Sequence, residues 1–309
     1  MGRETRAVID VGTNSVKLLI ATVDQDHIHP IIEESKQTRL GAGFFETGQL
    51  QPAAIIETAK AVAKFASIVR DWSATRLTVI ATSAAREAIN QRELVDALEH
   101  ASGTRLSIIS GEQEADWAFK GVCTDASMRE RNLLVMDLGG GSTEFIFGRN
   151  GAASFSRSFR LGTVRLMESQ QISDPPLPAE RVNCEKAIAA LLEKDVEPWL
   201  ASTRGDFNSI QLIGTGGTPS LLARIHLNLR RYDRELIEQV SIPLPDLVAH
   251  NVRLWNLPLE ARKSVPGLPP SRADVILTGG LIFEQVMRRL NLHSLRVSTR
   301  GLRFAALLF

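Results

Sequence analysis

The chain has 309 residues, 44 % of them hydrophobic, which is enough for two domains with separate cores. Its 36 lysines and arginines almost balance 35 acidic residues, so the net charge of +1 gives no electrostatic reason to expect nucleic acid or a membrane as a partner. There is no signal-peptide pattern and no apolar run of roughly 18 residues, and the two isolated cysteines, Cys123 and Cys184, are typical of reduced thiols. We therefore expect a cytoplasmic protein that binds neither nucleic acid nor membranes.

The first predicted element is a pair of strands joined by a tight turn. An apolar run from Ala7 leads to Asp10, Gly12 follows two residues later, and Ser15 opens a second strand-like run that extends to Val23. Glycine permits positive φ and leaves backbone N–H groups uncovered, so such a turn can surround anionic oxygens. The carboxylate of Asp10 is a hard oxygen ligand suited to Mg²⁺. The stretch therefore predicts a phosphate-binding turn beside a metal ligand.

A third strand is expected over Ile28–Ser35, and the glycine-rich segment Thr38–Leu50, which contains Arg39, is expected as a loop. Pro52 occupies the first position of a predicted helix over Ala53–Trp72. The apolar residues of this helix recur at helical spacing, which predicts that one face packs on the sheet. That face is expected to comprise Ile56, Ala59, Val62, Ala63, Ala66 and Val69.

A buried strand, Leu77–Ala81, is followed by a threonine and a serine, either of which can cap a helix that carries Arg86 in its first or second turn. A cation near a helix N-terminus opposes the helix dipole. Arg86 is therefore either held there by an anion in the active site or is a solvated surface arginine. The next two elements are expected as a helix over Asn90–Ser102 and a strand over Leu106–Ile109.

Another helix is predicted over Ser110–Val122, where Ser110 and Gln113 have the spacing of a capping box. Glu112 and Glu114 fall in its first turn. The helix dipole stabilises a charged carboxylate there and keeps it ready to accept a proton, which suits a general base. The same placement also suits carboxylates that only stabilise the end of the helix.

The polar segment Thr124–Arg131 is a predicted hinge into a second domain. After it, an apolar run leads to Asp137, and the chain then continues through Gly139, Gly140, Gly141 and Ser142 into a strand-like run with Glu144. Asp, Gly and Ser recur here with the spacing of the first turn, 127 residues later. One such turn could be an ordinary glycine-rich hairpin. Two copies predict two similar domains that face one another across a cleft, each with a phosphate-binding turn.

Two further glycine pairs follow apolar runs and are predicted as turns, one within Leu212–Thr218 and one within Ile276–Phe283. Neither of the first two turns has the Walker pattern or the dinucleotide-binding glycine pattern before a helix, which disfavours both classes of site. The remaining expected elements are helices over Arg181–Leu200, Pro219–Leu229, Asp246–Asn256 and Leu281–Leu290 and a strand over Leu295–Val297.

The motifs DVGTNS, RLGAG, ATSAAREAIN, SGEQEA, DLGGGSTE, GTGGT, LPPSRADVILTGG and GLR occur in this order between Asp10 and Arg303. This ordered set resembles the exopolyphosphatase and guanosine pentaphosphate phosphohydrolase family, which belongs to the superfamily of actin, sugar kinases and Hsp70-type ATPases. Two positions depart from the family pattern. Thr13 stands where many members have Ser, and Gln113 replaces the first Glu of the family's G-x-E-E-A pattern.

The resemblance implies an α/β fold with two ribonuclease H-like domains of the actin-like ATPase superfamily. Each domain would be a mixed five-stranded sheet with flanking helices, and the active site would lie in the interdomain cleft. The first domain would comprise residues 1–125 together with a closing helix over residues 301–309. The second would comprise residues 126–300.

The resemblance also implies the reaction, which is Mg²⁺-dependent hydrolysis of the terminal phosphoanhydride bond of inorganic polyphosphate with release of orthophosphate. Glu114 corresponds to the family's catalytic base. The ligands expected for Mg²⁺ or another divalent cation are Asp10, Asp137 and Glu144. The residues expected to bind phosphate are Gly12, Thr13, Asn14, Ser15, Arg39, Arg86, Gly139, Gly140, Gly141, Ser142 and Gly216.

Other activities remain open. The same catalytic group could hydrolyse guanosine pentaphosphate or a nucleoside triphosphate, and a non-hydrolysing actin-like protein could bind nucleotide as a switch. Guanosine pentaphosphate and guanosine tetraphosphate are therefore further candidate partners. Glu114 on a capped helix favours hydrolysis, and one tyrosine with four dispersed tryptophans offers no obvious platform for a base. A sugar kinase is disfavoured, because kinases of this fold typically use an Asp of the second domain as base. A homodimer is one assembly compatible with the resemblance.

Overall fold

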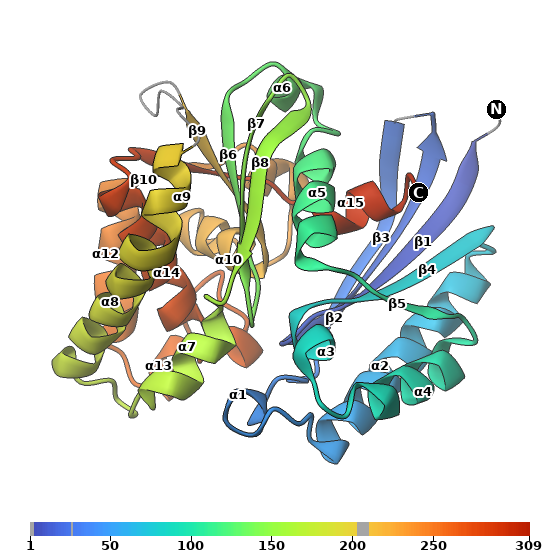
Figure 1. Ribbon diagram of the computed structural model, residues 1–309, viewed down its shortest axis with the longest axis horizontal. Coiled ribbons are helices and arrows are strands. Elements are labelled where there is room, and N and C mark those ends of the chain that lie inside the picture. The colour runs from blue at the N-terminus through green and yellow to red at the C-terminus, as the bar shows by residue number, and fades with distance from the viewer. Residues whose placement is uncertain (1–2, 26, 203–209) are drawn as a thin grey trace. The chain divides into compact units, whose positions relative to one another are not determined.

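The computed structural model describes residues 3–25, 27–202 and 210–309. The contacts between residues divide the chain into unit 1, which comprises Met1–Ala126 with Arg300–Phe309, and unit 2, which comprises Ser127–Thr299. Each unit contains one mixed β-sheet with helices around it (Figure 1). The α/β class with two mixed sheets is therefore confirmed. No helix among the described residues is both long and apolar enough to cross a membrane.

The sheet of unit 1 has five strands in the order β3-β2-β1-β4-β5. The first three strands form an antiparallel meander, and β1, β4 and β5 are parallel to one another. The strands are β1 (Glu4–Val11), β2 (Ser15–Asp24), β3 (His27–Gln37), β4 (Arg76–Ala81) and β5 (Leu106–Ile108). The carboxyl ends of the parallel strands lie at one edge, the usual place for a binding site in such sheets.

Helices cover both faces of this sheet (Figure 1). Alternate residues of β1 enter two different cores, since Ala7 and Ile9 pack with the helices α2 (Pro52–Asp71) and α4 (Gln91–Ser102), whereas Val8 packs with the closing segment. The opposite face is covered by α5 and α15. The remaining helices of the unit are α1 (Phe44–Thr47), α3 (Ser83–Glu87), α5 (Gly111–Val122) and α15 (Leu302–Ala306), and α6 (Ala126–Arg129) lies at the sequence boundary with unit 2.

The packing of α15 on α5 requires a glycine at position 121. A Cβ at Gly121 would come within 2.0 Å of the carbonyl oxygen of Gly301. On α2 the predicted apolar face is wrong at one position, because Ile56 is 54 % exposed and Ile55 is buried in its place. The buried face of α2 also includes Phe65, which packs in the core between this helix and the sheet.

The sheet of unit 2 has six strands in the order β10-β11-β9-β6-β7-β8, one more than the five expected. The additional strand, β10, has three residues, contains a proline and pairs with β11 at the edge of the sheet. Such a short segment has no readable alternation, so sequence patterns miss it. The strands are β6 (Leu133–Leu138), β7 (Thr143–Arg149), β8 (Ala152–Phe159), β9 (Gln211–Gly216), β10 (Ser241–Pro243) and β11 (Ser294–Val297).

The helices of unit 2 pack around one core that is centred on α14. The predicted helix that begins near Arg181 is present, but it passes through one turn of π-helix, Leu192–Val196. The helices are α7 (Thr163–Gln170), α8 (Pro178–Leu191), α9 (Glu197–Ser202), α10 (Gly217–His226), α11 (Arg234–Glu238), α12 (Leu244–Trp255), α13 (Leu259–Arg262) and α14 (Ile276–Arg289), with a 3-10 turn over Pro270–Arg272.

The fourth predicted glycine turn is wrong. Residues 276–283 form the first two turns of α14, and its two glycines are helical. They allow close packing, because a Cβ at Gly279 would lie 2.7 Å from the side chain of Thr218 and a Cβ at Gly280 would lie 2.1 Å from Asn251 Oδ1. These glycines therefore seat α14 against α10 and α12.

Candidate active site

The first predicted phosphate turn closes the hairpin between β1 and β2. The N–H of Gly12 donates to the carbonyl of Ser15 at 3.0 Å, and a Cβ at position 12 would lie 3.3 Å from that oxygen. Thr13, Asn14 and Ser15 are all buried. The turn is thus a compact backbone structure in which position 12 leaves little room for a side chain.

The segment after β3 binds the carbonyl groups of this turn. The N–H of Gly41 donates to the carbonyl of Thr13 at 2.8 Å, and the N–H groups of Thr38 and Arg39 donate to that of Asn14 at 3.2 and 3.1 Å. In a trans peptide the C=O and N–H groups point in opposite directions. The N–H groups that follow these carbonyls therefore point away from the segment, toward the side where an anion could bind.

Asp10 lies on the face of the sheet that α5 and α15 cover, in the cross-strand pair with Lys17. The carboxylate is 7 % exposed, and its Oδ1 has no hydrogen-bond partner among the described residues. Burial raises the pKa of Asp10 above its ordinary value, while the charges of Lys17 and Arg303 lower it. A buried carboxylate oxygen without a partner is costly and suits a cation or a water held by one.

Glu114 and Arg86 come together at the carboxyl edge of the same sheet. Arg86 Nη1 donates to Glu114 Oε2 at 3.0 Å and to the carbonyl of Ile109 at 2.8 Å. The side chain of Glu114 is 9 % exposed and that of Arg86 is 25 % exposed. The helix α5 that carries Glu114 is capped by Ser110, whose hydroxyl accepts from the N–H of Gln113 at 3.1 Å. The carboxylate is therefore held in a defined orientation near the end of β5.

This pair excludes one of the two interpretations of Arg86 and distinguishes two glutamates. Arg86 is partly buried and bound to Glu114, so it is not a solvated surface arginine. Glu112 is exposed, and hydrogen bonds from its own N–H and from Ser110 lower the pKa of its carboxyl. A fixed, buried carboxylate is better placed to orient a water than an exposed one that caps its own helix. Arg39 lies at an exposed position beside the first turn, where its N–H donates to the carbonyl of Asn14.

The second phosphate turn repeats the first in unit 2. The N–H of Gly139 donates to the carbonyl of Ser142 at 2.9 Å, and a Cβ at position 139 would lie 3.1 Å from that oxygen. In the described ranges, the N–H groups of Gly140 and Gly141 donate to no backbone carbonyl. Both turns thus have the same closing hydrogen bond, and the second presents two further N–H donors to an anion.

The helix α7 binds the carbonyl groups of the second turn. The N–H of Thr163 donates to the carbonyl of Gly139 at 3.1 Å, and the N–H groups of Val164 and Arg165 donate to that of Gly140 at 2.9 and 3.1 Å. Arg165 Nε adds a bond of 2.7 Å to the carbonyl of Gly141. The sequence interpretation missed Arg165. The sequence pattern that could have identified it is an arginine in the first turn of a helix. The helix dipole disfavours a cation there, so such an arginine indicates another binding partner.

Two carboxylates lie on one face of the sheet beside this turn. Asp137 and Glu144 are cross-strand partners, and Glu144 is 1 % exposed and accepts a hydrogen bond of 2.7 Å from Ser158, its partner on β8. Gly216, at φ 102°, approaches Asp137 so closely that a Cβ there would lie 2.8 Å from Asp137 Oδ1. Side chains of directly opposed residues are close enough to share a ligand. Asp137, Glu144 and Gly216 therefore form one group with the turn.

This donor set fits Mg²⁺. Two neighbouring carboxylates supply the hard oxygen ligands that Mg²⁺ prefers. Among the residues that the structure describes, no three His, Cys, Asp or Glu side chains are grouped as a metal site. Mg²⁺ usually keeps several waters and binds through one or two carboxylates and substrate phosphates, so a set of two protein ligands is sufficient.

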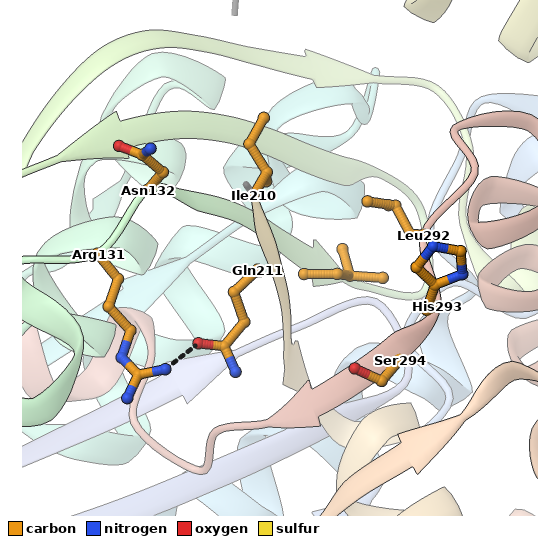
Figure 2. A pocket seen from close by; sticks show the side chains of 8 residues that line it. Arg131, Asn132, Ile210, Gln211, Leu292, His293 and Ser294 are labelled. Carbon is orange, nitrogen blue, oxygen red and sulfur yellow. Dashed lines mark hydrogen bonds between the residues drawn. The ribbon is translucent and has the colours of Figure 1, made fainter. Parts of the chain in front are cut away.

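A separate pocket of about 420 Å³ lies in unit 2 (Figure 2). It is found at the amino ends of β6, β9 and β11, whereas the phosphate turn follows the carboxyl end of β6. Arg131 at its wall donates to Gln211 Oε1 at 3.1 Å. None of the predicted site residues lines this pocket, which includes Asn132, His293 and Ser294. The pocket and the candidate active site are therefore different places.

A sequence model of the Ppx/GppA phosphatase family matches residues 19–308. The chain belongs to this family. The family resemblance drawn from the ordered motifs is thus confirmed, and the match includes the second phosphate turn but begins four residues after the first turn ends at Ser15. A Ppx/GppA assignment also agrees with a hydrolase that acts on phosphoanhydride bonds.

Relatives within the family fall into two groups by length. Exopolyphosphatase 2 of Mycobacterium tuberculosis is 32 % identical over 296 residues, which cover 92 % of this chain and 90 % of that protein. The guanosine-5'-triphosphate,3'-diphosphate pyrophosphatase of Aeromonas salmonicida is 27 % identical, and the match covers 96 % of this chain but 57 % of that protein. The crystal structure of an exopolyphosphatase from Cytophaga hutchinsonii matches with a TM-score of 0.88 and 27 % identity, over 98 % of this chain and 96 % of that one.

Proposed function

We propose that this Ppx/GppA protein is an exopolyphosphatase that hydrolyses the terminal phosphoanhydride bond of inorganic polyphosphate and releases orthophosphate. The observation that carries the choice of substrate is the similarity to exopolyphosphatase 2 over nearly the full length of both chains. The match to the guanosine enzyme covers only 57 % of that protein's length. Support for the chemistry comes from Glu114, Arg86 and the two phosphate turns.

Glu114 is the proposed general base. Its carboxylate would accept a proton from a water and direct that water at the terminal phosphorus. Arg86 holds the carboxylate in place through the bond of 3.0 Å, so its role is to position the base. This differs from the sequence interpretation, in which Arg86 is one of the residues that bind phosphate. Arg39 retains that role in the proposal.

Each of the two turns is proposed to bind phosphate oxygens of the substrate. Backbone N–H groups of Gly140, Gly141 and Ser142 in unit 2, and of the turn over residues 12–15 in unit 1, are preorganised by the carbonyl contacts described above. Donors that are fixed in advance stabilise charge in the transition state without a reorganisation cost.

Asp137 and Glu144 are the proposed ligands of Mg²⁺ in unit 2, and Asp10 is a proposed cation ligand in unit 1. When bound, the ion would polarise the phosphoryl oxygens and neutralise the charge that develops on them. Asp10 differs from the other two because Lys17 stands across the strand from it, whereas Glu144 stands across from Asp137.

The second candidate function is hydrolysis of guanosine pentaphosphate by the same groups, since the family contains relatives named for that activity. The test is a pair of phosphate-release assays with Mg²⁺, one on long polyphosphate and one on guanosine pentaphosphate. We expect a higher kcat/KM per chain end for polyphosphate. A clear preference for the guanosine nucleotide would overturn the substrate while leaving the proposed roles of the residues in place.

A cytoplasmic location is also proposed. Cys123 and Cys184 are both buried, and neither forms a disulfide. Burial raises the pKa of the Cys184 thiol to about 12, so it stays protonated and unreactive at neutral pH. Free thiols of this kind are usual for proteins that work in a reducing compartment.

A further inference from the structure

In the first phosphate turn, the hydrogen-bond acceptors of Asn14 are occupied and its donors are not. Its backbone carbonyl accepts from the N–H groups of Thr38 and Arg39 at 3.2 and 3.1 Å, and its Oδ1 accepts from Gln37 Nε2 at 3.1 Å. Neither the N–H nor the Nδ2 of Asn14 donates to a group among the residues that the structure describes. A residue that offers only donors is suited to an anion.

The side chain of Gln37 lies on the face of the sheet that carries Asp10. Asp10 stands opposite Lys17, and Lys17 stands opposite Ser35, two residues before Gln37 on β3. Directly opposed residues share a face of the sheet, and so do residues two apart on one strand. Because Gln37 Nε2 reaches Asn14 Oδ1, the amide of Asn14 lies on the same side of the sheet as a proposed cation ligand.

The bond from Gln37 determines which arm of the Asn14 amide is available to a ligand. Oxygen and nitrogen are the two arms of one planar group, so an amide whose Oδ1 is bound to Gln37 directs its Nδ2 elsewhere. This Nδ2 keeps some contact with solvent, since it is not among the fully enclosed polar atoms without a partner in the described ranges. With the opposite orientation, the amide oxygen would face the ligand and would repel an anion.

The second phosphate turn has no equivalent of this amide. Gly141 takes the place of Asn14 when the two turns are aligned on their aspartates, and glycine has no side chain. The contact that holds position 141 comes from Arg165 Nε, which donates to the backbone carbonyl at 2.7 Å. Of the two turns, the first therefore has a side-chain donor in addition to its backbone N–H groups.

We propose that Gln37 is a positioning residue, which orients the amide of Asn14 so that its Nδ2 donates to a phosphate oxygen of bound polyphosphate. This inference rests on the proposed function, because it takes polyphosphate as the substrate. Gln37 acts through Asn14 and does not contact the substrate. Its replacement should weaken the binding of phosphate and leave proton transfer to Glu114 nearly unchanged.

The test is a double-mutant cycle of Gln37→Glu and Asn14→Ala. A carboxylate only accepts hydrogen bonds, so Gln37→Glu should turn the amide of Asn14 over and leave its oxygen facing the ligand. The probe is methylenediphosphonate, whose P–C–P bridge cannot be hydrolysed, and its Kd is measured by calorimetry with Mg²⁺. We expect Asn14→Ala to raise this Kd about 10-fold, the cost of one hydrogen bond to a charged group. Gln37→Glu alone should raise it at least as much.

The cycle separates the orientation of the amide from the added charge. In the Asn14→Ala background, Gln37→Glu retains only the repulsion by its charge, so its effect should be at least about threefold smaller than in the wild type. Gln37→Met adds no charge and should raise the Kd about twofold, because the released amide takes both orientations. Gln49→Met, at an exposed glutamine of the same unit, is the matched control and should behave like the wild type.

Steady-state kinetics on long polyphosphate provide a second measurement. Gln37→Glu should raise KM and change kcat less than about threefold, since the lost interaction serves binding. Equal effects of Gln37→Glu on the Kd in the two backgrounds would overturn the inference, because Gln37 would then not act through Asn14. An unchanged Kd in Gln37→Glu would overturn it as well.

The two measurements also distinguish this inference from the proposed function. If the cycle shows the expected coupling but the wild type hydrolyses no polyphosphate, the proposed function is wrong and Gln37 still positions Asn14 for a phosphate group. If the wild type hydrolyses polyphosphate and the coupling is absent, the inference alone is overturned. A wild type that neither binds methylenediphosphonate nor hydrolyses polyphosphate would overturn both.

Discussion

The guanidinium of Arg86 donates a hydrogen bond of 3.0 Å to the carboxylate of Glu114, 28 residues away in the sequence. The same nitrogen donates to the carbonyl of Ile109, the residue that follows β5. One arginine therefore connects α3, the end of β5 and α5. The proposed base owes its orientation to this connection as much as to the capped helix that carries it.

Replacing the base should abolish most of the activity. Glu114→Gln keeps the size and polarity of the side chain but removes the proton acceptor, so we expect phosphate release to fall by about 10²- to 10⁴-fold. Binding of polyphosphate should survive. Glu112→Gln is the matched control, since Glu112 lies two residues away in the same helical turn and is exposed. Near-normal turnover of a folded Glu114→Gln protein, with a loss in Glu112→Gln, would reassign the base.

Replacing Arg86 should affect catalysis through the position of Glu114. We expect Arg86→Ala to lower kcat by about 10- to 100-fold, because a base misplaced by about 1 Å loses this much. Arg86→Lys keeps a donor and should recover part of kcat. A role in binding the departing chain predicts the opposite pattern, with KM raised and kcat retained. Steady-state kinetics on all three proteins distinguish these roles.

Removing one carboxylate of the unit 2 pair should change the metal requirement. A neutral amide is a poorer ligand for Mg²⁺ than a carboxylate. Asp137→Asn should therefore raise the Mg²⁺ concentration for half-maximal activity by at least about 10-fold. Loss of a residue that only hydrogen-bonds to a metal ligand already lowers metal affinity by about this factor. Glu144→Gln should act in the same direction. A titration with an unchanged midpoint would remove Asp137 from the metal site. Asp10→Asn should behave likewise only if Asp10 shares the ion.

The helical glycines of α14 should be intolerant of a methyl group. In Gly280→Ala the new Cβ would meet Asn251 Oδ1 at 2.1 Å, and we expect the free energy of unfolding to fall by about 1–3 kcal/mol. Gly217→Ala is the control, because no atom lies within 4 Å of a Cβ built there. Its effect should stay within about 0.5 kcal/mol. Denaturant unfolding of both variants measures the difference, and equal stabilities would show that α14 can shift away from α12.

The two histidines between α10 and α12 should make the protein less stable in mild acid. His226 Nδ1 lies 3.2 Å from His250 Nε2, and burial together with His226 and Arg253 lowers the pKa of His250, while Asp246 raises it. The unfolded chain therefore takes up a proton at a higher pH than the folded chain does. Stability is fully present above the ordinary histidine pKa of 6.5 and is lost as the pH falls below it.

Unfolding free energies at pH 7.5, 6.5 and 5.5 test this histidine pair. We expect His250→Gln to reduce the loss between pH 7.5 and 5.5, because the variant has no group to protonate at that position. An equal pH dependence in the wild type and His250→Gln would assign the acid sensitivity to other residues.

The two phosphate turns and the helix of Glu114 were predictable because their determinants are local. Asp, Gly and Ser at fixed spacing between strand-like runs specify a hairpin turn within a few residues. Ser110 likewise marks the start of α5 through a contact with Gln113 three residues away. Spacing alone does not assign a role to these residues. The family resemblance then gave Glu114 the role of catalytic base and the turns the role of binding phosphate.

Only the tertiary structure decided the conformation of one glycine pair and the contacts between residues that are distant in the sequence. A Gly-Gly pair after an apolar run reads as a turn, yet residues 279 and 280 are helical because α14 must approach Thr218 and Asn251. Three contacts of the candidate site depend on how distant segments pack. They are the hydrogen bond between Arg86 and Glu114, the hydrogen bond from Arg165 to the carbonyl of Gly141, and the cross-strand pair of Asp137 and Glu144. Sequence by itself determined which residues could bind phosphate, accept a proton or hold a metal. Their partners were decided only in the folded chain, because the distances that govern hydrogen bonds and charge pairs exist only after strands and helices have packed.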